Sequence, residues 1–253
     1  MINHLIFCSP EQKPGGDKQV IITKQIEVPD LMATSGNRTI EVYTDMSGDS
    51  DPRDWDCLGT IVGWDRDVQL GKKQIKEQYQ VELVLLDILD DAMYLSYEQY
   101  YNVMEYATAE VLMNAIKKHT KAVVLPIYVY NHSGISVSTS SYRYRMFDSA
   151  GWDWGISGII YATESKIKEE YGGDKVTDEM RTKAIEVLKE EIKTLDMYYK
   201  NEVYWYTVKE GGEEVDSCGG IYAEDLKDLK KELKSMVNDD FKELVENLDY
   251  CSY

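Results

Sequence analysis

Hydrophobic and polar residues alternate along two stretches near the N-terminus, Val20–Val28 and Thr39–Asp45, and both are rich in β-branched residues. Alternation places one side of an extended chain in a core, so we predict two strands here. The loop between them holds turn-forming residues, namely Pro29, Ser35, Gly36 and Asn37. The same reasoning predicts further strands at Leu58–Trp64, Ala122–Asn131, Ile135–Ser140, Ser157–Ala162, Val203–Val208 and Glu214–Tyr222.

Other stretches repeat their apolar residues with the 3.6-residue period of a helix. Tyr97–His119 places Val103, Ala107 and Val111 on one face, and Ser96 can cap its start. The compact apolar stretch Val81–Leu89 precedes it in the same helical region. We also predict a short helix that follows Thr163 and ends at Gly172–Gly173, a long helix at Thr177–Tyr199, and one or two acidic helices in the last 30 residues.

Strands and helices follow one another in mixed order, without clear βαβ units. This order predicts an α+β fold with a mainly antiparallel sheet, flanking helices and an acidic helical insertion. We divide the chain into a β-rich part at residues 1–71, the insertion at 72–121, and an α+β core with acidic C-terminal helices at 122–253. The length also allows all three parts to form a single domain.

The charge is strongly acidic and unevenly distributed. The chain has a net charge of −18, and residues 41–110 carry 16 acidic against 5 basic side chains. Residues 210–253 carry 13 acidic against 5 basic side chains. Such a surface repels nucleic-acid and membrane phosphates and attracts basic proteins. We therefore expect a basic protein partner and no direct contact with nucleic acid or membrane, with acidic solubility as the alternative.

A stretch of 40 residues between Lys76 and Lys117 contains no lysine or arginine. Tyrosines are interleaved with its carboxylates, and tyrosine is well suited to protein interfaces. Asp91, Glu98 and Glu105 are seven residues apart, so on one continuous helix they would share a face at about 10.5 Å spacing. The alternative is a solvated face with its tyrosines in the core. The candidate partner-binding residues are Glu82, Asp87, Asp90, Asp91, Glu98, Tyr101 and Glu105.

A second candidate cluster comprises His132, Asp148 and Cys218. His132 follows the strongest predicted strand, and a thiol, an imidazole and a carboxylate together can form a nucleophilic site. Phosphate-binding glycine loops, nucleophile elbows and HExxH motifs do not occur in the sequence. The alternative is that these side chains hydrogen-bond turns. The basic, aromatic segment Tyr142–Gly155 could stack nucleobases, but buried aromatic residues fit the overall charge better.

Neither a cofactor nor a bound metal is expected. The loop Asp45–Asp56 holds five aspartates, but their spacing differs from a calcium-binding EF-hand. The four cysteines form no CxxC pair and have no histidine at ligand spacing. The N-terminal residues do not have the pattern of a secretory signal, so we expect a cytosolic protein with free thiols. Tyrosine- and methionine-rich surfaces leave a homodimer open as an alternative.

Several blocks in the middle of the chain resemble a family of uncharacterised proteins encoded by phages and integrated mobile elements of Gram-positive bacteria. The blocks occur in order at 52–60, 125–128, 132–135, 147–158, 160–161, 169–172 and 215–218. No established activity comes with the family, but its genetic setting implies a protein that defeats a host defence system. Combined with the charge, the resemblance favours a DNA-mimic-like inhibitor of a basic, nucleic-acid-binding host protein in the bacterial cytoplasm. An enzyme that degrades a defence signal or modifies a host protein, and a housekeeping phage protein, are the alternatives.

Overall fold

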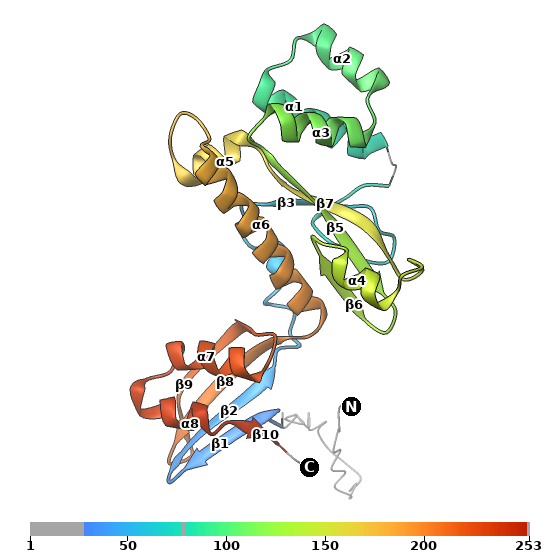
Figure 1. The fold of residues 1–253 in the computed structure, drawn as a ribbon. Coiled ribbons are helices and arrows are strands. Elements are labelled where there is room, and N and C mark those ends of the chain that lie inside the picture. The colour runs from blue at the N-terminus through green and yellow to red at the C-terminus, as the bar shows by residue number, and fades with distance from the viewer. Residues whose placement is uncertain (1–27, 77–78, 252–253) are drawn as a thin grey trace, which may run out of the picture.

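The computed structural model describes residues 28–76 and 79–251, which fold into two five-stranded sheets with helices packed on them (Figure 1). The strands are β1 (Leu31–Ser35), β2 (Arg38–Thr44), β3 (Thr60–Gly63), β4 (Lys73–Gln74), β5 (Val123–Asn131), β6 (Ile135–Ser138), β7 (Trp154–Ala162), β8 (Val203–Glu210), β9 (Glu213–Tyr222) and β10 (Asp249–Tyr250). Apart from the parallel β3–β4 pair, the described strands pair antiparallel. The predicted α+β class is confirmed.

The first sheet, which we call the terminal sheet, joins strands from both ends of the described chain in the order β10-β1-β2-β8-β9. Its central pair aligns Ile40 with Val208 and Val42 with Tyr206, and all four side chains are buried. Helices α7 (Leu226–Met236) and α8 (Lys242–Glu246), with the 3-10 turn η2 (Asp239–Phe241), pack against the same core. Two segments about 160 residues apart therefore share one core.

The second sheet, the central sheet, has the order β4-β3-β7-β5-β6 and is covered on both faces. Neighbouring residues Ile159 and Ile160 on β7 point to opposite faces, as the pleat of a strand requires. Ile160 packs in the core formed with α6 (Asp178–Tyr199). Ile159 packs in the core formed with α1 (Tyr79–Met93) and α3 (Ala109–His119).

Helix α6 is the long amphipathic helix that the sequence predicts. Thr177 caps it by accepting a hydrogen bond from the backbone N–H of Met180. Its buried stripe is Ala184, Leu188, Ile192 and Leu195, and the helix then leads from the central sheet to β8 of the terminal sheet (Figure 1). The remaining short helices are η1 (Pro52–Asp54), α4 (Tyr142–Phe147) and α5 (Glu164–Tyr171).

The single helix predicted at Tyr97–His119 is wrong, because the chain forms α2 (Tyr97–Tyr106) and then α3. Ser96 caps α2 in a reciprocal capping box with Gln99, as predicted. The break follows at Ala107 and Thr108, both extended, where the Thr108 hydroxyl caps the new helix. The apolar period continues across the break, which is why periodicity alone does not reveal it.

The loop predicted between the first two strands is also wrong in part. Its residues 31–35 form β1, which pairs with β2 through a tight turn at Gly36. Gly36 has a φ of +61°, a conformation that glycine adopts without a steric penalty. The strand predicted at Val20–Val28 falls outside the described residues except for Val28, which lies in no strand.

Strand pairing groups the chain differently from the three segments drawn from the sequence. The helices of 72–121 do form one consecutive group, α1 to α3. Within 1–71, however, β1 and β2 join the terminal sheet, whereas β3 joins the central sheet. Within 122–253, β5 to β7 join the central sheet, α6 covers one of its faces, and β8 to β10 join the terminal sheet.

Candidate functional site

The predicted row of carboxylates on one helix does not exist. Helix α1 ends at Met93 and α2 begins at Tyr97, so Asp91 lies on one helix and both Glu98 and Glu105 on the other. The connection turns at Tyr94, whose φ is +52°. Because the three residues do not share a continuous helix, the 10.5 Å repeat estimated for one helix does not apply.

Three of the predicted carboxylates, Asp87, Asp90 and Asp91, form hydrogen bonds within the fold, and a fourth, Glu82, has a buried oxygen. Asp90 Oδ1 accepts the backbone N–H of Leu95 at 2.7 Å and thereby closes the end of α1. Asp91 Oδ2 accepts the N–H of Ser165 at 3.2 Å, which ties α1 to α5. Asp87 accepts the Tyr100 hydroxyl at 2.8 Å. The Oε2 atom of Glu82 is buried and has no hydrogen-bond partner among the described residues.

Three tyrosines of this region, Tyr94, Tyr97 and Tyr101, point to solvent instead of the core. Tyr94 is 81% exposed, Tyr97 is 79% exposed and Tyr101 is 46% exposed. The rings of Tyr97 and Tyr101 contact each other, with their centroids 4.4 Å apart. Glu98 and Glu105 are exposed on the same helix. We call this surface the α1–α2 face and define it by Asp87, Tyr94, Tyr97, Glu98, Tyr101 and Glu105.

Tyr100 fixes α2 to α1 beneath this surface. Its hydroxyl donates to the Asp87 carboxylate, and this hydrogen bond raises the pKa of Tyr100 to about 12. The phenol is therefore neutral and bonded at physiological pH. Helix α2 is held by this bond, by the Ser96 capping box and by partial burial of Val103. Among the described side chains of α2, Tyr100 and Val103 are partly buried and the others are exposed.

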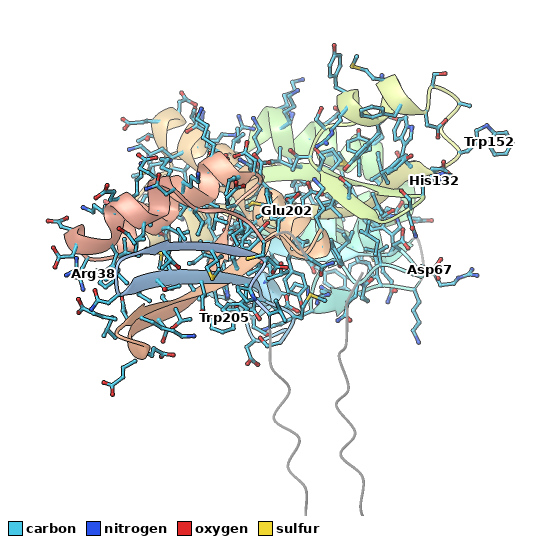
Figure 2. All side chains as sticks on the ribbon, turned by 90° about the horizontal axis from the view of Figure 1, so that it is seen from below. Arg38, Asp67, His132, Trp152, Glu202 and Trp205 are labelled. Carbon is cyan, nitrogen blue, oxygen red and sulfur yellow. The ribbon has the colours of Figure 1, made fainter. Side chains whose placement is uncertain are left out.

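The second candidate cluster is not assembled. His132 follows β5 and its Nδ1 lies 3.1 Å from an oxygen of Asp153, so it borders the central sheet. Cys218 lies on β9 of the terminal sheet, where it is aligned with Tyr206. Figure 2 shows His132 and Trp152 toward one end of the molecule, and Trp205, on the strand beside β9, well away from them toward the other side. The thiol and the imidazole therefore lie in different parts of the molecule and do not come within the hydrogen-bond reach that a nucleophilic site requires.

Asp148 has the structural role that we gave as the alternative to catalysis, because it hydrogen-bonds a turn. Its carboxylate accepts backbone N–H groups from Ala150, Gly151 and Asp153 at 2.9–3.1 Å and so shapes the turn after α4. These hydrogen bonds, that of Asp153 first, lower the pKa of Asp148. A carboxylate occupied in this way stabilises a turn and is not a general base.

The segment Tyr142–Gly155 exposes three of its five aromatic residues, so the expectation that they are buried is wrong for Tyr142, Phe147 and Trp152. Four large side chains are at least 72% exposed, and we call them the α4 tip: Tyr142, Met146, Phe147 and Trp152. Tyr144 alone among the residues of α4 is buried. Arg143 and Arg145 are exposed on the same helix, and the Arg145 guanidinium lies 5.9 Å from the Trp154 ring centroid.

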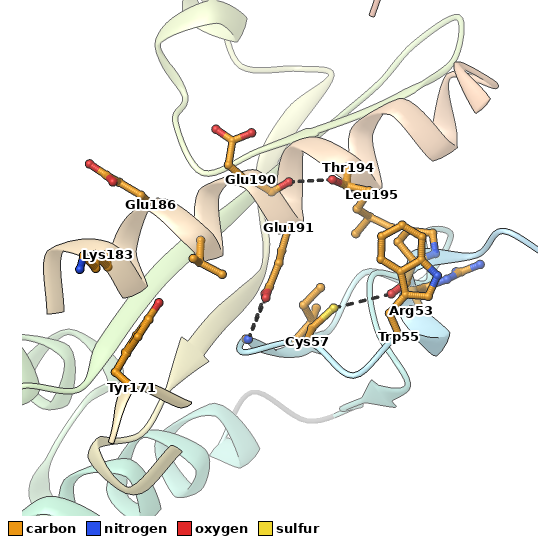
Figure 3. A pocket seen from close by; sticks show the side chains of 14 residues that line it. Arg53, Trp55, Cys57, Tyr171, Lys183, Glu186, Glu190, Glu191, Thr194 and Leu195 are labelled. Atoms are coloured by element: carbon orange, nitrogen blue, oxygen red, sulfur yellow. Dashed lines mark hydrogen bonds between the residues drawn. The ribbon is translucent and has the colours of Figure 1, made fainter. Parts of the chain in front are cut away.

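A pocket of about 500 Å³ lies beside α6, where the segment 52–61 and the end of α5 approach the helix (Figure 3). Its walls are mainly apolar. Trp55, Ile61 and Tyr171 face α6, which contributes Val187 and Leu195. The sequence pattern does not predict this pocket. A sequence feature that could have indicated the pocket is Val187, an apolar residue on the polar side of α6, where it is exposed.

Glu191 forms the inner polar wall of this pocket. Its carboxylate accepts the N–H of Leu58 at 2.8 Å and the N–H of Gly59 at 3.0 Å, which joins α6 to the segment before β3. A Cβ atom at Gly59 would lie 2.4 Å from the Glu191 carboxylate, so this approach requires glycine. Burial raises the pKa of Glu191, and the two N–H donors oppose that shift. Burial likewise raises the pKa of the nearby Cys57 thiol, which disfavours a reactive thiolate.

Two aspartates of the loop 45–56 interact with serine and arginine side chains of the same loop. Asp45 accepts hydrogen bonds from the hydroxyls of Ser47 and Ser50, and Asp51 forms an ion pair with Arg53. The Arg53 guanidinium also lies over the ring of Tyr198. In the described ranges, no group of three His, Cys, Asp or Glu side chains is arranged to hold a metal ion.

Neither a scan against protein-family models nor searches of curated proteins and solved structures finds a match. The resemblance to phage and mobile-element proteins therefore stays a prediction. Among the described residues, none of the helices has the length and apolar character needed to cross a membrane.

Proposed function

We propose that the chain is a counter-defence binding protein. It would engage a basic, nucleic-acid-binding host protein through the α1–α2 face and block it without catalysis. The exposure of Tyr94, Tyr97 and Tyr101 beside Glu98 and Glu105 carries this proposal. Burying a large aromatic side chain against a partner's surface is favourable because it removes apolar area from water. Tyrosine also loses little conformational entropy when binding fixes its side chain.

The charge around these tyrosines selects the partner. Residues 77–116 contain no lysine or arginine, so helices α1 and α2 provide no cation to neutralise the exposed carboxylates. Of the face's carboxylates, Glu98 and Glu105 have no ion pair among the described residues. A basic groove that normally holds a phosphate backbone would supply the missing charge.

Two double variants test the proposal after the partner has been captured from a bacterial lysate and purified. E98K/E105K reverses two charges on the face, and D174K/E213K reverses two exposed charges elsewhere, so both variants change the net charge equally. We expect the first to weaken binding at least about tenfold, and the second to change it less than about threefold. Calorimetry at low and high salt measures both, and the wild-type affinity should fall as salt rises.

Equal losses in the two variants would show that net charge alone governs binding, which contradicts an assignment to this face. A chain that retains no stoichiometric protein at low salt contradicts the binding role itself and favours the housekeeping alternative. Removing the aromatic contribution with Y97A/Y101A gives an independent measure, because it leaves every charge in place. We expect a loss of about tenfold or more from that variant as well.

A further inference from the structure

The pocket beside α6 is a second feature that points to a ligand. A volume of about 500 Å³ is within the range typical of sites for small organic molecules. The side chains of Trp55, Ile61 and Val187 line it, so most of a ligand's contact would be apolar. None of the residues of the α1–α2 face belongs to its lining, and the pocket is therefore independent of the proposed function.

Three carboxylates and two cationic side chains line the pocket. Glu186 and Glu190 are exposed on the helical side, and Glu191 is half-buried in the wall. The two cationic side chains that line the pocket are already paired: Lys183 with Glu179 at 2.9 Å, and Arg53 with Asp51. A ligand would therefore encounter a local excess of negative charge together with the apolar walls.

Trp55 adds an aromatic surface to this arrangement. Its indole is 47% exposed, and its ring meets Tyr222 edge to face at 5.4 Å. Figure 3 shows the Trp55 ring beside Cys57 on the wall opposite α6, with Glu190 and Glu191 on the helix. An indole face attracts ammonium and guanidinium groups through its quadrupole, and nearby carboxylates add to that attraction.

We propose that this pocket binds an organic cation, an apolar chain or ring that ends in an ammonium or guanidinium group. The apolar part would fill the space between Trp55, Ile61 and Val187, and the cationic end would lie near Glu190. The same chemistry occurs in a free amine and in the arginine of a peptide, so the experiment includes both sources.

Calorimetry on the full chain uses 4-phenylbutylamine as the probe and 4-phenylbutan-1-ol as its neutral analogue. The amine should bind at least about tenfold more tightly than the alcohol. Replacing Val187 with tryptophan (V187W) should abolish binding by filling the space, and E190Q should weaken it about threefold or more. E213Q removes an exposed carboxylate outside the pocket and should leave binding unchanged. Circular dichroism of V187W verifies the fold, and E190Q keeps the test informative if V187W is unstable.

Alkylation of Cys57 by iodoacetamide locates the bound probe, because Cys57 lines the pocket and is half-buried. Bound amine should slow modification of Cys57 but not that of Cys218, measured by peptide mass spectrometry. A second titration uses the capped tripeptide acetyl-Ala-Arg-Ala-amide. Tighter binding of the peptide assigns the pocket to a side chain of a protein, and tighter binding of the amine assigns it to a free small molecule. Equal affinity for amine and alcohol, or binding that survives V187W, would overturn the proposal.

Discussion

The α1–α2 face and the α4 tip both expose large aromatic side chains, but they differ in charge and in how they are anchored. The α1–α2 face combines tyrosines with carboxylates, whereas the α4 tip combines Tyr142, Phe147 and Trp152 with two arginines. Exposed aromatic residues indicate binding in general, and the surrounding charge indicates the kind of partner. The two surfaces therefore suit different partners, although the chain is acidic as a whole.

Their anchoring differs just as clearly. Below the α4 tip, buried Tyr144 contacts Ser136 at 3.1 Å, and Ser136 donates to buried Asp196 of α6. Below the α1–α2 face, Tyr100 donates to exposed Asp87. A buried polar network is costly to break because its members have no access to water, whereas an exposed bond is readily replaced by water.

The largest predicted effect comes from removing the centre of the buried network. Asp196 accepts the N–H of Val137 at 2.7 Å and the hydroxyl of Ser136 at 2.8 Å, and it pairs with Lys200. We expect D196A to lower the free energy of unfolding by about 3 kcal/mol, since it leaves buried donors unpaired. Denaturant unfolding measures the change. D196N keeps an acceptor and should lower the free energy of unfolding less. A loss below about 1 kcal/mol for D196A would contradict the proposed difference in anchoring between the two surfaces.

A smaller effect separates the N-caps of the two surfaces. The Ser96 hydroxyl accepts the N–H of Gln99 in a capping box, whereas Ser141 before α4 makes no such side-chain bond. We expect S96A to destabilise α2 by about 1 kcal/mol and S141A to affect α4 much less. Amide hydrogen exchange of each helix measures this locally. Equal protection losses in both helices would show that the two caps contribute alike.

The smallest effect concerns the ionisation of two tyrosines. The pKa values of Tyr100 and Tyr144 are both about 12, but the main cause is the Asp87 hydrogen bond for Tyr100 and burial for Tyr144. A raised folded-state pKa contributes stability that is present below the unfolded value of about 10 and lost as the pH rises through about 12. D87N should lower the pKa of Tyr100 and leave that of Tyr144 unchanged. An NMR titration of both rings measures this, and a parallel change in Tyr144 would contradict the separation of causes.

Local signals predicted much of the fold. Thr163 and Thr177 cap helices where helices are predicted, and β5, β6, β8 and β9 form at predicted strands and pair as two hairpins. A cap or a tight hairpin depends on residues close in sequence, so the pattern carries the information. The break at Thr108 and strand β1 were missed, since an unbroken apolar period conceals one and nearby turn residues conceal the other.

The candidate sites were predicted less well. Glu98, Tyr101 and Glu105 do lie on an exposed face, but Asp90 and Asp91 bond to backbone groups, and that depends on where α1 ends and α5 begins. The pocket was missed because it joins segments more than 100 residues apart, as the bond from Gly59 to Glu191 shows. Sequence spacing contains no information about such a contact.

Composition and local pattern are enough to predict the acidic charge, the absence of lysine and arginine from 77–116, the helix caps and the alternating strands, because each depends on residues that are a few positions apart or on none in particular. Long-range packing separates Cys218 from His132, turns the aromatic residues of the α4 tip to solvent, and places Val187 beside a pocket. Those features depend on which distant segments bury one another's apolar surface, and that choice is made by packing of the whole chain.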